Sequence, residues 1–379
     1  MTSSSNASSP ASSSPAQTHG AAPKPDRVAL VVGASGITGS ALVDRLAGDG
    51  WRVLALARRE GRPVAGVQWI SADLRSPESL RSALDGQGIS HVFFSAWARQ
   101  NTEEENIAVN GGMVRDLLAA LGSSPVVHAS LVTGLKHYLG PFDAYAQGEM
   151  PDTPFHEEEP RLDTPNFYYA QEDELFAAAE RQGFTWSVHR SHTVIGHAVG
   201  NLMNMGLTLA TYASICKHFD IPFVFPGSET QWNGLTDMTD STVLAEQMVW
   251  AATTPAGANE AFNVVNGDVF RWRWMWPQLA AYFGVEPVGF ETAPRPLEQQ
   301  MAGMGEVWAQ IAAKHALVEP DLGRLASWWH TDADLGRDIE VVTDISKSRL
   351  AGFHTHHRTV DSFTALFDRY RHDGLIPAE

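Results

Sequence analysis

The sequence has little cysteine and no long hydrophobic run. Its 379 residues include one cysteine, Cys216, so no disulfide can form within the chain. No apolar stretch reaches the roughly 18 residues that a membrane-spanning helix requires. These absences predict a globular protein in a reducing, cytoplasmic compartment, with no membrane partner.

Positive charge is also scarce. The chain carries 27 Lys and Arg against 44 Asp and Glu, a formal net charge of -17, and it has no Lys/Arg-rich block. Nucleic acids and anionic membranes bind positive surfaces, so both are excluded as partners. The 44% hydrophobic content suffices for a large core. We therefore expect a small-molecule partner, with a homodimer left open.

The pattern along the chain predicts three parts. Residues 1–26 are Ser, Ala and Pro without an apolar core, which predicts a disordered tail; a transit peptide is less favoured because no arginine precedes Arg27. Residues 27–195 alternate strand-like and helix-like segments, as in a Rossmann-type α/β fold with a doubly wound parallel sheet. Residues 196–379 contain Met-rich and Trp-rich helical stretches. They predict a smaller, mainly helical substrate-binding region intertwined with the Rossmann core.

A glycine-rich turn follows the first strand-like run. In "GASGITG", Gly33, Gly36 and Gly39 lie between that run and an amphipathic helix. Such a turn lets the backbone approach a pyrophosphate and aims helix N–H groups at its negative charge. A tight turn without a ligand is the alternative, but strand, helix and second strand together favour dinucleotide binding. The GxxGxxG spacing resembles the extended short-chain dehydrogenases.

The end of the second strand indicates which cofactor binds. An acidic residue there would accept a hydrogen bond from the ribose 2′-hydroxyl of NAD, but Arg58 and Arg59 occupy the position. Paired guanidinium groups fit a 2′-phosphate, so we expect NADPH. A solvated basic turn is the alternative. Asp73 and Leu74, after the third strand, are the expected adenine contact, unless Asp73 merely caps the next helix.

The segment "NFYYAQEDELF" contains a candidate catalytic tyrosine without its usual partner. Short-chain dehydrogenases generally place a lysine four residues after this tyrosine, whereas Tyr168 is followed at that distance by Glu172. The chain has only five lysines. One of them, Lys136 in "LVTGLKHYLGPF", lies just past the fifth strand, at the sheet edge where parallel α/β proteins place their active sites. A nearby ammonium group favours proton donation by a phenol and can also bind a cofactor ribose.

Several motifs together resemble one family. "TGLKHYLGPF", "NFYYAQEDELF", "WSVHRSHTVIG", "QWNGLTDMTD" and "EAFNVVNGDVFRWRWMW" are similar, in order, to motifs of the PRISE family, the progesterone 5β-reductase and iridoid synthase-like enzymes. The resemblance runs from Arg27 to the C-terminus. It implies an atypical short-chain dehydrogenase that uses NADPH to reduce the activated C=C bond of small hydrophobic enones, enals and related conjugated carbonyls, steroids included.

The resemblance also implies site residues. Tyr168 and Lys136 would be catalytic and would contact the cofactor, with Tyr168 stabilising the enolate after hydride reaches the β-carbon. Further cofactor contacts would be Ser35, Gly36, Ile37, Arg58, Arg59, Asp73, Leu74, Ala96, Trp97, Val132, Val194, Asn201, Leu202 and Met203. The substrate pocket would include Trp97, Phe142, Tyr168 and Met205. Two departures concern its shape: Ser191-His192 replaces the Pro-Gly of plant members, and Val132 replaces their glutamine.

Other functions remain as alternatives. A carbonyl reductase or nucleotide-sugar epimerase would need the usual tyrosine and lysine spacing, and a non-catalytic NADPH-binding regulator would tend to lose both residues. A metal site is not expected, although His189, His192 and His197 lie close in sequence. Alternate strand residues point to opposite faces, and no cysteine or carboxylate pattern completes a ligand set.

Overall fold

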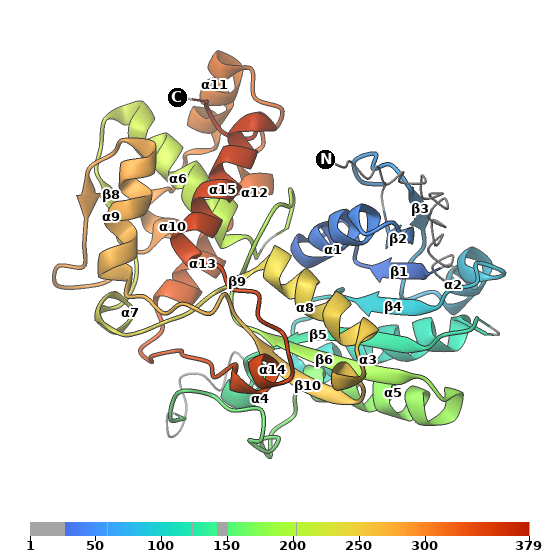
Figure 1. Cartoon of the computed structure of the whole chain (residues 1–379). Helices are drawn as coiled ribbons and strands as arrows, with labels where there is room; N and C mark the ends of the chain where they lie inside the picture. Colours follow the sequence, from blue (N-terminus) through green and yellow to red (C-terminus); the bar gives the residue numbers. More distant parts are fainter. Residues whose placement is uncertain (1–26, 59, 123, 142–150, 202, 379) are drawn as a thin grey trace, which may run out of the picture.

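The computed structural model describes residues 27–58, 60–122, 124–141, 151–201 and 203–378, so the predicted disordered tail lies outside it (Figure 1). Its centre is a seven-stranded sheet in the order β10-β6-β5-β4-β1-β2-β3, and every pairing is parallel. This confirms the predicted Rossmann-type fold. The strands are β1 (Val28–Val32), β2 (Arg52–Ala57), β3 (Val67–Ser71), β4 (His91–Phe94), β5 (His128–Gly134), β6 (Thr185–Ser191) and β10 (Glu260–Val264).

Helices cover both faces of this sheet because strand side chains alternate between the faces. In β1, Ala29 and Val31 pack into the layer under α1 (Ile37–Gly48) and α8 (Ser241–Thr253). Leu30 and Val32 pack into the opposite layer, with α2 (Pro77–Leu84), α3 (Glu103–Ala120) and α5 (Phe167–Gln182). Because both faces are covered, the central strand β1 (VALVV) is apolar and buried along its whole length.

The chain beyond residue 195 contributes to both parts of the molecule. Strand β10 pairs with β6 at the edge of the sheet, and α8 packs beside α1. The remaining long helices gather to one side in Figure 1: α6 (Met205–Phe219), α9 (Trp272–Phe283), α11 (Gly305–His315), α13 (Trp328–Leu335) and α15 (Thr359–His372). Residues beyond 195 thus contribute both to the edge of the sheet and to the helical region.

The helical region has a core of its own, built from the Trp-rich and Met-rich stretches. Trp272, Trp276 and Trp308 are fully buried in it, and Trp276 stacks on Phe223 with ring centroids 4.0 Å apart. Short elements complete the region: β7 (Val194–Ile195) with β9 (Thr239–Asp240), β8 (Phe223–Val224) with β11 (Pro287–Val288), and helices α7 (Glu229–Asn233), α10 (Leu297–Gln300), α12 (Leu322–Leu325) and α14 (Ser346–Leu350). Among the described residues, no helix is long and apolar enough to cross a membrane.

Candidate active site

The glycine-rich turn between β1 and α1 has the geometry of a phosphate loop. Gly33 has φ +81°, which favours glycine, and its N–H donates to the carbonyl of Leu56 at 3.1 Å. Gly36 is the N-cap of α1 and provides no side-chain cap, so the N–H groups of the first turn remain available to a ligand. A Cβ at Gly39 would lie 2.1 Å from the carbonyl oxygen of Gly33, so only glycine allows this close helix–strand approach. The loop therefore fits a pyrophosphate.

The residues expected at the adenosine end lie on the surface. Arg58 follows β2 and is exposed, while Arg59 lies outside the described residues. Asp73 accepts a hydrogen bond from the backbone N–H of Arg75 at 2.9 Å, and this bond holds the pKa of Asp73 below its usual value. The N-cap of α2 is Ser76, so the alternative assignment of Asp73 as that cap is wrong. The adenine contact by Asp73 and Leu74 stays a prediction.

A cavity of about 200 Å³ lies at the carboxyl ends of the strands. The segments that follow β1, β4, β5 and β6 all reach it, as expected for a parallel α/β sheet. Its lining includes these residues predicted from the sequence: Gly36, Ile37, Ala96, Trp97, Val132, Lys136, Tyr168, Val194, Asn201 and Met203. The tertiary structure thus brings together side chains from most of the quoted motifs.

The two predicted catalytic residues reach this cavity from different elements. Lys136 begins the four-residue helix α4 (Lys136–Leu139) directly after β5, and Tyr168 lies in the first turn of α5. The ring of Phe167 links them, because its centroid lies 4.7 Å from Lys136 Nζ and 4.4 Å from the Tyr168 ring. A Cβ on Gly134 would lie 2.9 Å from the carbonyl oxygen of Ser191 and 3.4 Å from the Tyr168 hydroxyl, so the backbone at Gly134 lies close to both groups. The arrangement places a phenol and an ammonium group at one site.

Glu172 occupies the position where a lysine would usually follow the tyrosine. Its side chain is 3% exposed and pairs with Arg161, with Oε2 2.8 Å from Nη2. Burial raises the pKa of Glu172, against the opposing charges of Arg190 and Arg161. This ion pair does not line the cavity. The structure therefore explains why no lysine stands there, since position 172 faces a different environment.

A polar wall that the sequence revealed only in part completes the cavity. His192 Nδ1 lies 2.8 Å from Asp237 Oδ1, and Arg337 Nη1 lies 3.0 Å from His192 Nε2. Because arginine is always a donor, Nε2 must accept and Nδ1 must carry the proton towards Asp237. Arg337 also pairs with Asp334, which accepts a hydrogen bond from Thr193 at 2.8 Å.

This wall was only partly visible in the sequence. His192 stood out as a departure from the plant motif, and Asp237 lies within the quoted "GLTDMTD". Arg337 and Asp334 belong to no recognised motif, and only packing brings α13 to the cavity. The described residues contain no cluster of three or more His, Cys, Asp or Glu that could hold a metal ion.

Some predicted site residues lie elsewhere. Met205 is buried in the helical core at the start of α6 and does not line the cavity, so the structure does not place it in the substrate pocket. Phe142 and Leu202, like Arg59, fall outside the described residues. Ser35 is exposed on the phosphate loop.

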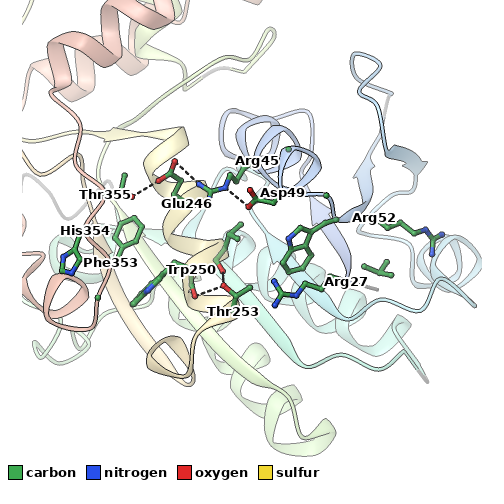
Figure 2. Close-up of a pocket in the computed structure, with 16 residues that line it drawn as sticks. Arg27, Arg45, Asp49, Arg52, Glu246, Trp250, Thr253, Phe353, His354 and Thr355 are labelled. Carbon is green, nitrogen blue, oxygen red and sulfur yellow. Dashed lines mark hydrogen bonds and ion pairs between the residues drawn. The ribbon is translucent and has the colours of Figure 1, made fainter. Parts of the chain in front are cut away.

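A larger groove, of about 1260 Å³, lies at the amino ends of β1 and β2, opposite the cavity at the carboxyl ends of the strands (Figure 2). Its lining includes Val28 and Arg52, the first residues of β1 and β2, and Trp250 of α8. Arg45 bridges Asp49 and the Glu246 carboxylate across it. None of the predicted catalytic or cofactor-binding residues lines this groove, so its size does not make it the active site.

The fold is a Rossmann-type α/β fold with a cavity at the carboxyl ends of its parallel strands. Solved structures with this fold include UDP-glucose 4-epimerase of Thermus thermophilus in complex with NAD (TM-score 0.63, 19% identity, covering 91% of this chain and 99% of that one). A short-chain dehydrogenase/reductase superfamily protein of Agrobacterium tumefaciens with bound NAD is similar (TM-score 0.62, 15% identity, covering 92% and 98%). At these identities the likeness establishes the fold alone.

The sequence comparisons establish the family. A family model described as a PRISE-like Rossmann-fold domain matches residues 76–377. The chain is 37% identical to 3-oxo-Delta(4,5)-steroid 5-beta-reductase of Arabidopsis thaliana, over 93% of this chain and 94% of that protein. It is 36% identical to an (S)-8-oxocitronellyl enol synthase of Camptotheca acuminata, over 92% and 93%. The chain belongs to the PRISE family, which confirms the predicted family and identifies the chain as an oxidoreductase.

Proposed function

We propose that this protein reduces the activated C=C bond of conjugated carbonyl compounds with NADPH. The observation that carries the proposal is the meeting of Lys136 and Tyr168 in one cavity at the carboxyl edge of the sheet. Membership of a family that includes a named steroid 5-beta-reductase supports the same reaction. The usual lysine position holds the buried Glu172, which argues against the catalytic arrangement of an ordinary ketone reductase.

The cofactor proposal rests on the phosphate loop and the basic residue after β2. The loop glycines and the uncapped start of α1 suit a pyrophosphate, and Arg58 suits a 2′-phosphate. The nicotinamide, when bound, supplies the hydride for the β-carbon. Lys136 would hold the ribose, while Val132 and Val194 would provide apolar contacts in the cavity.

Tyr168 would act on the substrate carbonyl. As the β-carbon receives hydride, negative charge develops on the carbonyl oxygen, and the phenol would donate a hydrogen bond to it while solvent protonates the α-carbon. Tyr168 lines the cavity, where a substrate carbonyl would bind. Removal of one such donor typically costs about 10²- to 10³-fold in rate. Trp97, Leu135 and Leu139 give the cavity an apolar side for a small hydrophobic substrate.

The test is an NADPH oxidation assay with cyclic enones, enals and simple ketones. The wild type should turn over enones or enals, and Tyr168→Phe should lower kcat by about 10²- to 10³-fold. Tyr282→Phe, which removes a hydroxyl bonded to Asp368 in the helical region, is the matched control and should keep full activity. Turnover of ketones alone would support the carbonyl-reductase alternative. NADPH binding without turnover of any compound would support a regulatory protein. Cytoplasmic location and a homodimer stay predictions.

A further inference from the structure

The separation of Lys136 and Tyr168 depends on tertiary contacts. Residues four apart on one helix are neighbours because the helix backbone itself spaces them. Here the two residues lie on α4 and α5, and α4 has only four residues, too few to be stable alone. Some contact between these helices must therefore hold the ammonium group and the phenol at a fixed separation.

One buried side chain joins the backbones of both residues. Asn166 is 3% exposed and is the N-cap of α5, where its Oδ1 accepts the N–H of Tyr168 at 3.0 Å. Its Nδ2 donates to the carbonyl of Lys136 at 2.8 Å. Capping needs only the acceptor, as the hydroxyl caps Ser76 and Thr102 show on α2 and α3. The amide donor adds a link that capping does not require.

We propose that Asn166 is a positioning residue that holds Lys136 beside Tyr168, in place of the helical spacing used where lysine follows tyrosine on one helix. This inference rests on the proposed function. Asn166 does not line the cavity, so it would act through the two residues that it joins.

Neighbouring contacts strengthen the same junction. The Tyr169 hydroxyl donates to the carbonyl of His137 at 2.7 Å, which is a second bond from α5 to α4. The N–H of Phe167 donates to Glu103 at 2.7 Å, which ties the start of α5 to α3. Each residue of "NFYY" thus contributes to one rigid arrangement, and Asn166 is the member that bonds directly to the backbones of both catalytic residues.

The variant Asn166→Ser keeps the N-cap of α5 but removes the hydrogen bond to Lys136, so it tests the two functions of Asn166 separately. Serine caps a helix about as well as asparagine, so the Tyr168 N–H keeps an acceptor, but the bond to the Lys136 carbonyl is lost. A displacement of about 1 Å at an active site can cost 10²-fold in rate. We expect kcat to fall about 10- to 100-fold, with KM for the enone within about twofold of wild type. The Kd for NADPH should rise a few-fold, since Lys136 would hold the ribose.

A double-mutant cycle distinguishes positioning from a general loss of structure. In a Lys136→Met background, Asn166→Ser should lower kcat less than about twofold, because the group that it positions is gone. The matched control is Asn266→Ser. Asn266 is also fully buried and also bridges two segments, accepting from the Asp240 N–H and donating to Thr359 Oγ1. It should lower thermal stability while leaving kcat and the Kd for NADPH unchanged.

These measurements test the positioning role of Asn166 independently of whether the protein reduces enones. Wild-type kcat and Kd in Asn166→Ser, or an equal loss with and without Lys136, would overturn the positioning role. If Asn166→Ser does not fold, Asn166→Asp keeps the cap and the size but replaces the donor by an acceptor, and the same measurements apply. If the wild type reduces no compound tested, the proposed function fails, and the Kd series for NADPH still shows whether Asn166 positions Lys136.

Discussion

Replacement of Gly39 by alanine tests the close packing of α1 on the phosphate loop. The new Cβ would lie 2.1 Å from the Gly33 carbonyl oxygen and 2.8 Å from the Ala34 Cα. Ordinary contact begins at 3.4 Å, so helix and loop would have to separate by about 1.3 Å. Both neighbours are backbone, and no side-chain rotation can relieve the overlap. Overpacking of this kind costs about 1–3 kcal/mol of folding free energy, and at times more.

Cofactor binding should weaken as well, because the N–H groups of the first turn would move away from the pyrophosphate. Loss of one charge-assisted hydrogen bond costs about 1.5–3 kcal/mol, which is about a 10- to 150-fold rise in Kd. Equilibrium unfolding in urea measures the first effect, and NADPH titration by protein fluorescence measures the second.

Gly48→Ala is the matched control on the same helix. A Cβ at Gly48 meets no atom within 4 Å, so alanine should be neutral or should stabilise α1 by up to about 1 kcal/mol. NADPH affinity should not change. If Gly39→Ala unfolded at the wild-type urea concentration and bound NADPH as tightly as Gly48→Ala, the close approach of α1 and the loop would be refuted.

Three further changes test other parts of the structure. Arg58→Ala should raise KM for NADPH about tenfold and leave KM for NADH unchanged, because a guanidinium contributes most beside a 2′-phosphate; equal changes for both cofactors would contradict the proposed contact. Burial lowers the pKa of His128 to about 3 and that of His189 to about 4. Both stay neutral in the folded protein, so the free energy of unfolding should fall as the pH drops below about 6.5, by up to about 1.4 kcal/mol per pH unit for each histidine. Urea unfolding at pH 7.5 and pH 5 measures this, and equal stability would contradict it. Glu172→Lys should not restore the activity of Lys136→Met, because position 172 is buried outside the cavity; recovered turnover in the assay would refute that placement.

Much of the site was predictable because its signals are local. A positive φ at Gly33 and a close backbone approach at Gly39 impose glycine regardless of the rest of the fold. Lys136 was found from its place just after a strand, and the structure puts it at the carboxyl edge, in the cavity with Tyr168. The catalytic and cofactor roles of these residues stay predictions.

The parts that were missed depend on distant segments. Strand β10 pairs with β6 although about 70 residues separate them in the sequence. Its short apolar run did not indicate which strand of the sheet it would pair with. Arg337 follows α13 and reaches the cavity beside Asp334 of that helix, which accepts a hydrogen bond from Thr193 just after β6. Met205, which the family resemblance implied as a pocket residue, is buried in the helical core. Such placements follow from packing, which no short window of sequence records.

Neighbouring residues were enough to predict the Rossmann core, the family and the candidate pair Tyr168 and Lys136, because strand alternation, turn sterics and motif order are all local in the chain. The tertiary structure alone decided that Glu172 turns away to Arg161, and that Asn166 bonds to the backbones of both Lys136 and Tyr168. These contacts join segments that the chain separates. They form only when burial of the sheet and helix faces brings those segments together.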